Sequence, residues 1–150
     1  MADIVDSAAR SRMMAGISSR NTRPEVLLRR SLHSDGFRFR LHRRDLPGTP
    51  DFVLTRYHAA VFVHGCFWHH HDGCKNARIP ATRSAFWAEK FDQNRRRDDI
   101  QLSLLRKGGW RVAVVWECAI RTDLAGATEA LAAWVRQNMS YSPIFGQFSG

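Results

Sequence analysis

The stretch that decides the fold runs from Ala59 to Cys74 and reads Ala-Ala-Val-Phe-Val-His-Gly-Cys-Phe-Trp-His-His-His-Asp-Gly-Cys. Its first five residues are all apolar, which is typical of a strand buried on both faces near the centre of a sheet. The following eleven residues, 64–74, hold four of the seven histidines and two of the three cysteines. Since α/β proteins usually place their sites at strand ends, this segment predicts where the chemistry lies.

The elements on either side of this strand predict a mixed sheet flanked by helices. Thr22-Arg-Pro-Glu25 is a capping box for a helix that should end near Ser34. Residues 37–41 alternate apolar and basic side chains, which predicts a strand with one solvated face. The remaining expected elements are a turn at 46–50, a short strand over 51–54, a helix over 83–107, a buried parallel strand over 110–116 and a helix over 122–138.

The length of 150 residues fits one domain with its own core. We expect the domain to span residues 21–138, after an arm over 1–20 and before an uncharged tail over 139–150 that is mobile or lies on the surface. The first residues lack the basic and apolar regions of a secretory signal, and no apolar run approaches the ~20 residues of a membrane span. We therefore expect a cytoplasmic protein.

The charge of the chain favours nucleic acid as its partner. The net charge is +9, and 20 of the 23 basic residues are arginine. Arginine contacts phosphate through two parallel hydrogen bonds, and a strongly basic domain attracts a polyanion. The alternative is an arginine-rich genome that produced a merely solvated basic face.

The cysteines and histidines predict a metal site. An odd count of three cysteines makes a disulfide framework a poor explanation in a reducing compartment. Cys66, His71, Cys74 and Cys118 together supply the Cys₃His set of a tetrahedral zinc ion. With all four positions filled by protein, such a zinc is structural. His69 or His70 could replace His71, and the alternative to zinc is three idle cysteines.

Asp51 is the candidate ligand of a second, hard cation. It begins one strand, close to the end of the next strand, where His64 follows Val63. A Pro-Asp strand beside a strand that ends in a catalytic side chain is the layout of restriction-endonuclease-like nucleases. Their usual Glu-x-Lys ending is absent here, since the strand reads Val-Phe-Val-His. The alternative is an ordinary turn aspartate.

The long helix predicted over 83–107 carries an unexpected acid. Its inward stripe consists of Trp87, Phe91, Asn94, Asp98, Leu102 and Leu105. A carboxylate on an apolar face must be paired or hydrogen-bonded, so we expect Asp98 to have a partner.

Taken together, these motifs resemble those of the very short patch repair (Vsr) endonucleases, which are bacterial nickases of T·G mismatches. The resemblance runs from about Ala2 to Trp134, and its matching stretches are 46–52, 63–71, 80–83 with 86–87, 109–112 and 115–118. His-Gly-Cys-Phe-Trp-His is the most specific of them. One departure is that Asp72-Gly73 places Cys74 one residue farther from His71 than in a familiar member of the family.

The resemblance implies a role for each of these residues. Asp51 would bind Mg²⁺ with the backbone carbonyl of Val63, and His64 and His69 would flank the scissile phosphate, one of them activating water. Asp98 would orient a histidine, while Glu25 is either a catalytic acid or only a capping residue. The residues that would enter the base stack beside the mismatch are Phe67, Trp68, Trp87 and, from the arm, Met14; for these aromatics the alternative is core packing.

The function that the resemblance implies is a Mg²⁺-dependent, strand-specific endonuclease with structural zinc. It would recognise double-stranded DNA carrying the T·G mismatch left by deamination of 5-methylcytosine, and nick 5′ of the mispaired T. We expect a monomer associated with the nucleoid, and docking of a MutL-type repair protein stays open. The rival hypotheses are a His-metal nuclease of another class and a zinc-stabilised DNA-binding module without activity.

Overall fold

The computed structural model describes residues 22–71, 73–137 and 144–145. Within them, five strands form one sheet, and their order across the sheet, β1-β2-β3-β4-β5, is the same as their order along the chain. The strands are β1 (Arg40–Leu41), β2 (Phe52–Leu54), β3 (Ala59–His64), β4 (Arg111–Trp116) and β5 (Ile144–Phe145). Pairs β1–β2 and β2–β3 are antiparallel, whereas β3–β4 and β4–β5 are parallel. The α/β class and the mixed sheet are therefore confirmed, with the all-apolar strand at the centre.

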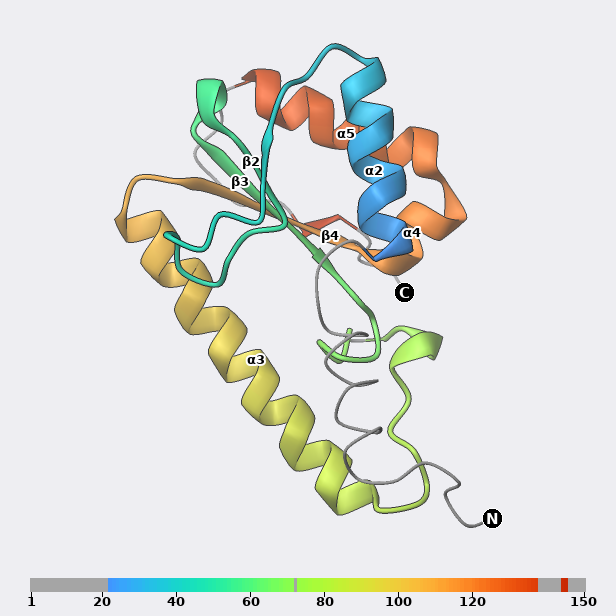
Figure 1. The fold of residues 1–150 in the computed structure, drawn as a ribbon. Helices are drawn as coiled ribbons and strands as arrows, with labels where there is room; N and C mark the ends of the chain where they lie inside the picture. Colours follow the sequence, from blue (N-terminus) through green and yellow to red (C-terminus); the bar gives the residue numbers. More distant parts are fainter. Residues whose placement is uncertain (1–21, 72, 138–143, 146–150) are drawn as a thin grey trace.

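Helices cover both faces of this sheet. On one face lie α2 (Arg23–Ser34), α4 (Glu117–Thr122) and α5 (Leu124–Gln137), and on the other lies the long α3 (Ser84–Lys107) (Figure 1). Two short 3₁₀ helices, Thr55–Tyr57 and Lys75–Ala77, lie in the connections.

Alternate side chains along β3 pack into the cores on opposite faces of the sheet. Ala59 and Val61 join the core under α2 and α5, whereas Ala60 and Phe62 join the core under α3. Successive residues of a strand point to opposite faces. His64 continues the second series, so it emerges at the strand's end on the α3 side. This period-2 rule puts a histidine next to the helix that carries Asp98.

The helix boundaries follow the predicted signals closely. Thr22 Oγ1 accepts a hydrogen bond from the backbone N–H of Glu25 at 3.4 Å, as an N-cap should. Helix α3 ends at Lys107, and Gly109, with φ of 88°, lets the chain turn into β4. The inward stripe of α3 is confirmed, since Phe91, Asn94 and Leu105 are buried.

Three parts of the fold differ from the prediction. Phe37 and Phe39 pack into the core as the alternation predicts, but only Arg40–Leu41 forms a ladder, at the sheet's edge. A separate short helix, α4, precedes α5, because Asp123 leaves the helical conformation and its Oδ1 accepts from the Gly126 N–H. In the tail, for which the sequence predicts no strand, Ile144–Phe145 pairs with β4.

Among the described residues, none of the helices combines the length and the apolar composition that crossing a membrane requires. The predicted arm over 1–20, including Met14, lies outside the described residues. The domain boundaries at 21 and 138 stay a prediction.

Candidate active site and metal cluster

A cavity of about 1000 Å³ at the carboxyl end of β3 collects half of the predicted site residues. Strand β3 contributes Val63 and His64, and the segment that follows adds Phe67, Trp68 and His69. The start of α2 and the loop before β2 form the opposite wall, and one face of α3 forms the third. The cavity therefore opens at the sheet's edge, between the helices of its two faces.

Asp51 lies just before β2, with its carboxylate turned to the end of β3. The backbone N–H of Val63 donates to Asp51 Oδ2 at 2.7 Å. Burial raises the pKa of Asp51 to about 8; the Val63 N–H and Arg29 oppose this shift, whereas the neighbouring Glu25 carboxylate adds to it. Two buried carboxylates repel each other when both are ionised, and a bound cation removes this conflict. The donor set at Asp51 thus suits a hard divalent cation.

Glu25 and His42 complete this acidic cluster. The Glu25 side chain is fully buried. Its Oε2 accepts a hydrogen bond from Arg29, one helical turn later, and one from His42 Nε2 at 2.9 Å. Glu25, His42 and Asp51 each offer a ligand atom, and these three atoms lie within 4.8 Å of one another. The Glu25 carboxylate thus lies close to that of Asp51, and whether it acts beyond capping the helix stays a prediction.

A second cluster joins His64, His69 and Asp98. The two imidazole rings stack with centroids 3.8 Å apart and planes 4° from parallel. His69 Nδ1 donates to Asp98 Oδ2 at 2.6 Å, which provides the partner that the acid on the apolar stripe required. Burial lowers the pKa of His64 well below its usual range, and the charges of His69 and Arg97 act in the same direction. The lowered pKa favours the neutral imidazole form of His64.

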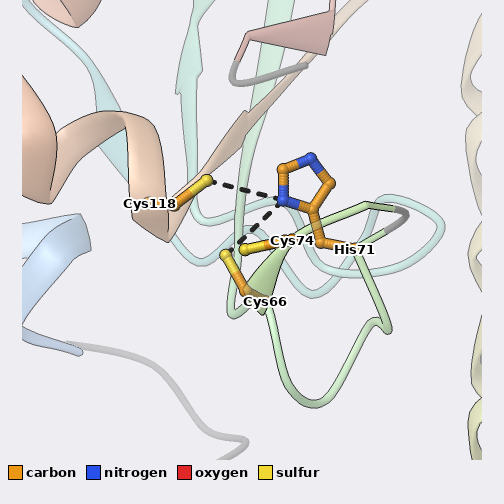
Figure 2. A group of neighbouring side chains, drawn as sticks. All are labelled: Cys66, His71, Cys74 and Cys118. Atoms are coloured by element: carbon orange, nitrogen blue, oxygen red, sulfur yellow. Dashed lines mark hydrogen bonds between the residues drawn. The ribbon is translucent and has the colours of Figure 1, made fainter. Parts of the chain in front are cut away.

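The third cluster contains the three cysteines and His71, from the segment after β3 and the first turn of α4 (Figure 2). His71 Nδ1 lies 3.7 Å from Cys66 Sγ and 3.5 Å from Cys118 Sγ. A tetrahedral zinc, with its usual bond lengths, holds sulfur and nitrogen ligands about 3.5 Å apart. The four ligand atoms lie within 4.8 Å of one another, so the cluster fits a closed tetrahedral metal site.

The environment of the thiols also favours a metal. Burial raises the pKa values of the Cys66 and Cys118 thiols. Such groups become thiolates only when a cation stabilises them, and metal binding displaces their protons. The neighbouring histidines are engaged elsewhere, since His69 contacts Asp98 and His70 stacks on Phe91 with centroids 4.9 Å apart. Of the three candidate histidines, His71 alone joins the described cluster.

Trp116, the last residue of β4, connects the thiol cluster to the histidine pair. The ring of His71 stacks on it with centroids 4.1 Å apart, and His64 meets it edge-on at 5.2 Å. The indole therefore contacts a residue of the thiol cluster and a residue of the histidine pair. Trp116 was not predicted as part of the site, although its position at the strand's end was a usable signal.

Aromatic side chains form the outer part of the cavity wall. Phe67 contacts Trp68, Trp87 and the buried Phe91, with ring centroids 5.1 Å, 5.4 Å and 5.1 Å away. Asn94 Nδ2 donates to the Trp68 carbonyl at 2.9 Å and so fastens this segment to α3. Phe67 and Trp68 are half-buried and line the cavity, whereas Trp87 packs behind them. Phe67 and Trp68 thus pack against side chains of α3 on one side and are accessible from the cavity on the other.

Three cations line the same cavity. Arg44 comes from the loop before β2, and Lys90 and Arg97 come from α3. Arg44 and Arg97 are exposed and Lys90 is half-buried. Positive groups from two walls that face one cavity suit a substrate with negative charge. In the sequence these residues stand out only through the net charge, because a helical face becomes a cavity wall only once the fold is known.

The described residues thus bring the predicted Asp51, His64, His69 and Asp98 together in the wall of one cavity. Glu25 does not line it, but lies buried in a cluster with His42 and Asp51, and the Cys₃His residues form a separate cluster. Val63 is present through its N–H, and the metal-binding role of its carbonyl stays a prediction. His42, like Trp116, was not predicted from the sequence. Its only signal was a histidine shortly before a Pro-Asp strand.

The sequence model of the family described as DNA mismatch endonuclease Vsr matches residues 2–76. A type II nicking enzyme of Xanthomonas oryzae pv. oryzae is 49% identical over 130 residues, which cover 87% of this chain and 93% of that protein. The DNA mismatch endonuclease Vsr of Escherichia coli is 46% identical over 140 residues, covering 90% of this chain and 88% of that protein. A type II nicking enzyme of Neisseria meningitidis serogroup A is 43% identical over 137 residues, covering 91% and 96%.

Proposed function

Because the chain belongs to the DNA mismatch endonuclease Vsr family, we propose that it is a strand-specific endonuclease that nicks mismatched double-stranded DNA. Its target is the T·G mispair that arises when 5-methylcytosine is deaminated. It cuts 5′ of the mispaired T and leaves a 5′-phosphate and a 3′-hydroxyl. The fold in this account is the restriction-endonuclease-like one, a mixed sheet with the acidic residue before one strand and a catalytic side chain at the end of the next.

The observation that carries this proposal is the meeting of two different clusters in one cavity. His42 and Asp51 of the first cluster line the cavity, with the buried Glu25 next to them. All three residues of the second cluster, His64, His69 and Asp98, line it as well. The first supplies hard oxygen donors, and the second supplies a hydrogen-bonded imidazole pair. A phosphodiester between them would meet a charge-stabilising group on one side and proton-transfer groups on the other.

The acidic cluster would hold Mg²⁺ through the Asp51 carboxylate, with help from Glu25 and the Val63 carbonyl. A bound Mg²⁺ supplies stabilisation of the negative charge that develops on the phosphate. The proximity of Asp51 and Glu25 supports this role. Burial and the Glu25 carboxylate raise the pKa of Asp51, and a bound cation would stabilise the ionised carboxylates.

The histidines would move the protons. His64, neutral because of its burial, would accept a proton from the attacking water. His69 would stabilise or protonate the leaving 3′ oxygen, and Asp98 would hold its ring through the Nδ1 hydrogen bond. The stacked arrangement keeps both rings in one orientation. The assignment of base and acid to the two histidines belongs to the proposal.

The Cys₃His cluster would hold a structural Zn²⁺. The separations of 3.5 Å and 3.7 Å between His71 Nδ1 and two sulfurs fit that ion. The zinc would act by holding the structure in place and not in the chemistry. Its ligands Cys66 and His71 lie on either side of the Phe67-Trp68 pair in the chain, and the His71 ring packs on Trp116. Zinc would therefore hold in place both the aromatic pair, Phe67 and Trp68, and the histidine pair, His64 and His69.

Phe67 and Trp68 would provide the selection for the mismatch, with Trp87 as their support and Met14 of the arm as a further intercalating residue. A mismatched step is easier to unstack than a paired one, so a rigid aromatic wedge favours it. The half-buried position of Phe67 and Trp68 in the cavity wall supports this role. Arg44, Lys90 and Arg97 would contact the phosphates on either side.

In the cell we propose that the protein acts as a monomer on nucleoid DNA in the cytoplasm. A MutL-type repair protein stays a candidate for docking next to the nick.

A strand-resolved nicking assay tests the proposed function. Duplexes labelled on either strand and carrying T·G, T·A or C·G at one position are incubated with Mg²⁺, in varied flanking contexts. We expect one nick, 5′ of the mispaired T, in the T·G duplex. Binding of the mismatch without nicking would favour a DNA-binding module instead. Nicking in excess EDTA, or with zinc alone, would favour a His-metal nuclease of another class.

A further inference from the structure

His42 contacts both acids of the proposed metal site, one with its side chain and one with its backbone. Its Nε2 donates to Glu25 Oε2 at 2.9 Å, and its backbone N–H donates to the Asp51 carbonyl at 3.1 Å. The His42 side chain is only 10% exposed. One residue therefore connects α2, which carries Glu25, to the segment that carries Asp51.

The backbone of His42 is held in an uncommon conformation to make these contacts. Its φ is 47°, in the left-handed region that residues other than glycine rarely adopt. Such strain persists only where the surroundings compensate for it, and it gathers at functional sites. Here the compensation is the pair of hydrogen bonds to Glu25 and to Asp51.

Arg29 acts on the same oxygen as His42. It lies one helical turn after Glu25 and also donates to Oε2. Two donors that converge on a single oxygen fix the rotation of a carboxylate, because each one restricts its plane. The Glu25 carboxylate is therefore held in one orientation next to Asp51 before any cation arrives.

We propose that His42 is a positioning residue, whose ring orients the Glu25 carboxylate toward the cation held at Asp51. This inference rests on the metal site of the proposed function. Hydrogen-bond partners of metal ligands typically contribute about tenfold to a hundredfold in metal affinity. The ring acts through Glu25 and does not itself touch the metal or the DNA.

The test measures binding of Mn²⁺ alone, by the loss of the free-ion signal in electron paramagnetic resonance, without DNA or turnover. His42→Asn keeps a residue that tolerates the left-handed backbone but is too short to reach Glu25. His42→Gln has an amide nitrogen at about the reach of Nε2 and restores the donor. His33→Ala removes an exposed histidine of α2 as the matched control, and Asp51→Asn tests the metal site itself. Zinc content and melting temperature are recorded for every variant.

We expect His42→Asn to weaken Mn²⁺ binding about tenfold, while His42→Gln stays within about twofold of the wild type. His33→Ala should bind as the wild type does, and Asp51→Asn should lose the site. In nicking assays the same His42→Asn variant should need more Mg²⁺ for half-maximal rate, and excess Mg²⁺ should largely restore kcat.

Unchanged Mn²⁺ binding in His42→Asn, with the site lost in Asp51→Asn, would overturn the positioning role and leave the proposed function intact. Equal losses in His42→Asn and His42→Gln would overturn it in favour of direct ligation by the imidazole. Unchanged binding in Asp51→Asn would overturn the metal site itself, and the inference with it.

Discussion

His69 Nδ1 lies 2.6 Å from Asp98 Oδ2, so a residue just after the central strand is held by a residue halfway along the long helix. This contact crosses from one wall of the cavity to another. It fixes which ring nitrogen of His69 carries the proton and how the ring stacks on His64.

Asp98→Asn should lower the single-turnover nicking rate by about a hundredfold, the usual contribution of a positioned proton-transfer group. The amide keeps the size of the side chain but removes the charge that orients the imidazole. Asp99→Asn, which removes the same charge from the exposed next position, is the control. If both variants nick equally fast, Asp98 does not act through His69.

Zinc should be present at one ion per chain, and folding should depend on it. Structural zinc contributes ~10–16 kcal/mol in small peptides, so Cys66→Ala and Cys118→Ala should give insoluble or unfolded protein. His71→Ala should lose zinc, whereas His70→Ala should keep it, since His70 stacks on Phe91 outside the cluster. Elemental analysis checks this, and a stable wild-type fold without metal would refute it.

Trp68→Ala should narrow the affinity gap between T·G and fully paired duplex by about tenfold to a hundredfold. Stacking of a base on an aromatic ring is worth ~1–3 kcal/mol by alanine substitution. Zinc content and melting temperature should change little, because Trp68 is half-buried and no ligand. Phe86→Ala, which removes an exposed ring next to Trp87, is the control.

A purely packing role for Trp68 predicts the reverse result. The melting temperature would then fall while discrimination between the duplexes stayed unchanged among folded molecules. Both quantities are measured on the same preparation, so the two roles are separated by one experiment.

Salt should weaken DNA binding steeply, because arginine contacts release counterions from the phosphates. With six or more contacts, affinity should fall by roughly 10³ or more between 50 and 200 mM salt. Arg97→Gln, at the cavity, should reduce by about one the slope of the plot of log binding constant against log salt concentration. Arg30→Gln, on an exposed part of α2, should leave this slope unchanged. A flat response in the wild type would show that the basic surface is not the binding surface.

The sequence predicts the parts of the fold whose signal is local. The apolar run at 59–63, the capping box at Thr22 and the glycines after Lys107 all correspond to observed boundaries. Each depends on a few neighbouring residues and on the period of the side chains. Elements that depend on distant partners were missed or misjudged, because β5 exists by pairing with β4 and residues 37–39 lie beyond the ladder of β1.

The same division applies to the site. His64, Asp51 and the cysteines stand out because strand ends and ligand spacing are visible in the chain. His42 and Trp116 do not, since their importance arises from contacts with Glu25 and with His64 and His71 across the fold. Asp98 is intermediate, because an acid on an apolar stripe predicts that a partner exists but not which one.

The most direct test of the central claim, metal-assisted nicking at Asp51, is a paired measurement on Asp51→Asn. Single-turnover nicking of the T·G duplex and affinity for the same duplex are both measured in Mg²⁺, with Asp35→Asn, at the exposed end of α2, as the control. We expect nicking to be abolished and mismatch binding to stay largely intact, because a metal ligand stabilises charge in the transition state more than it contacts the duplex. A near-normal nicking rate in Asp51→Asn would contradict the claim.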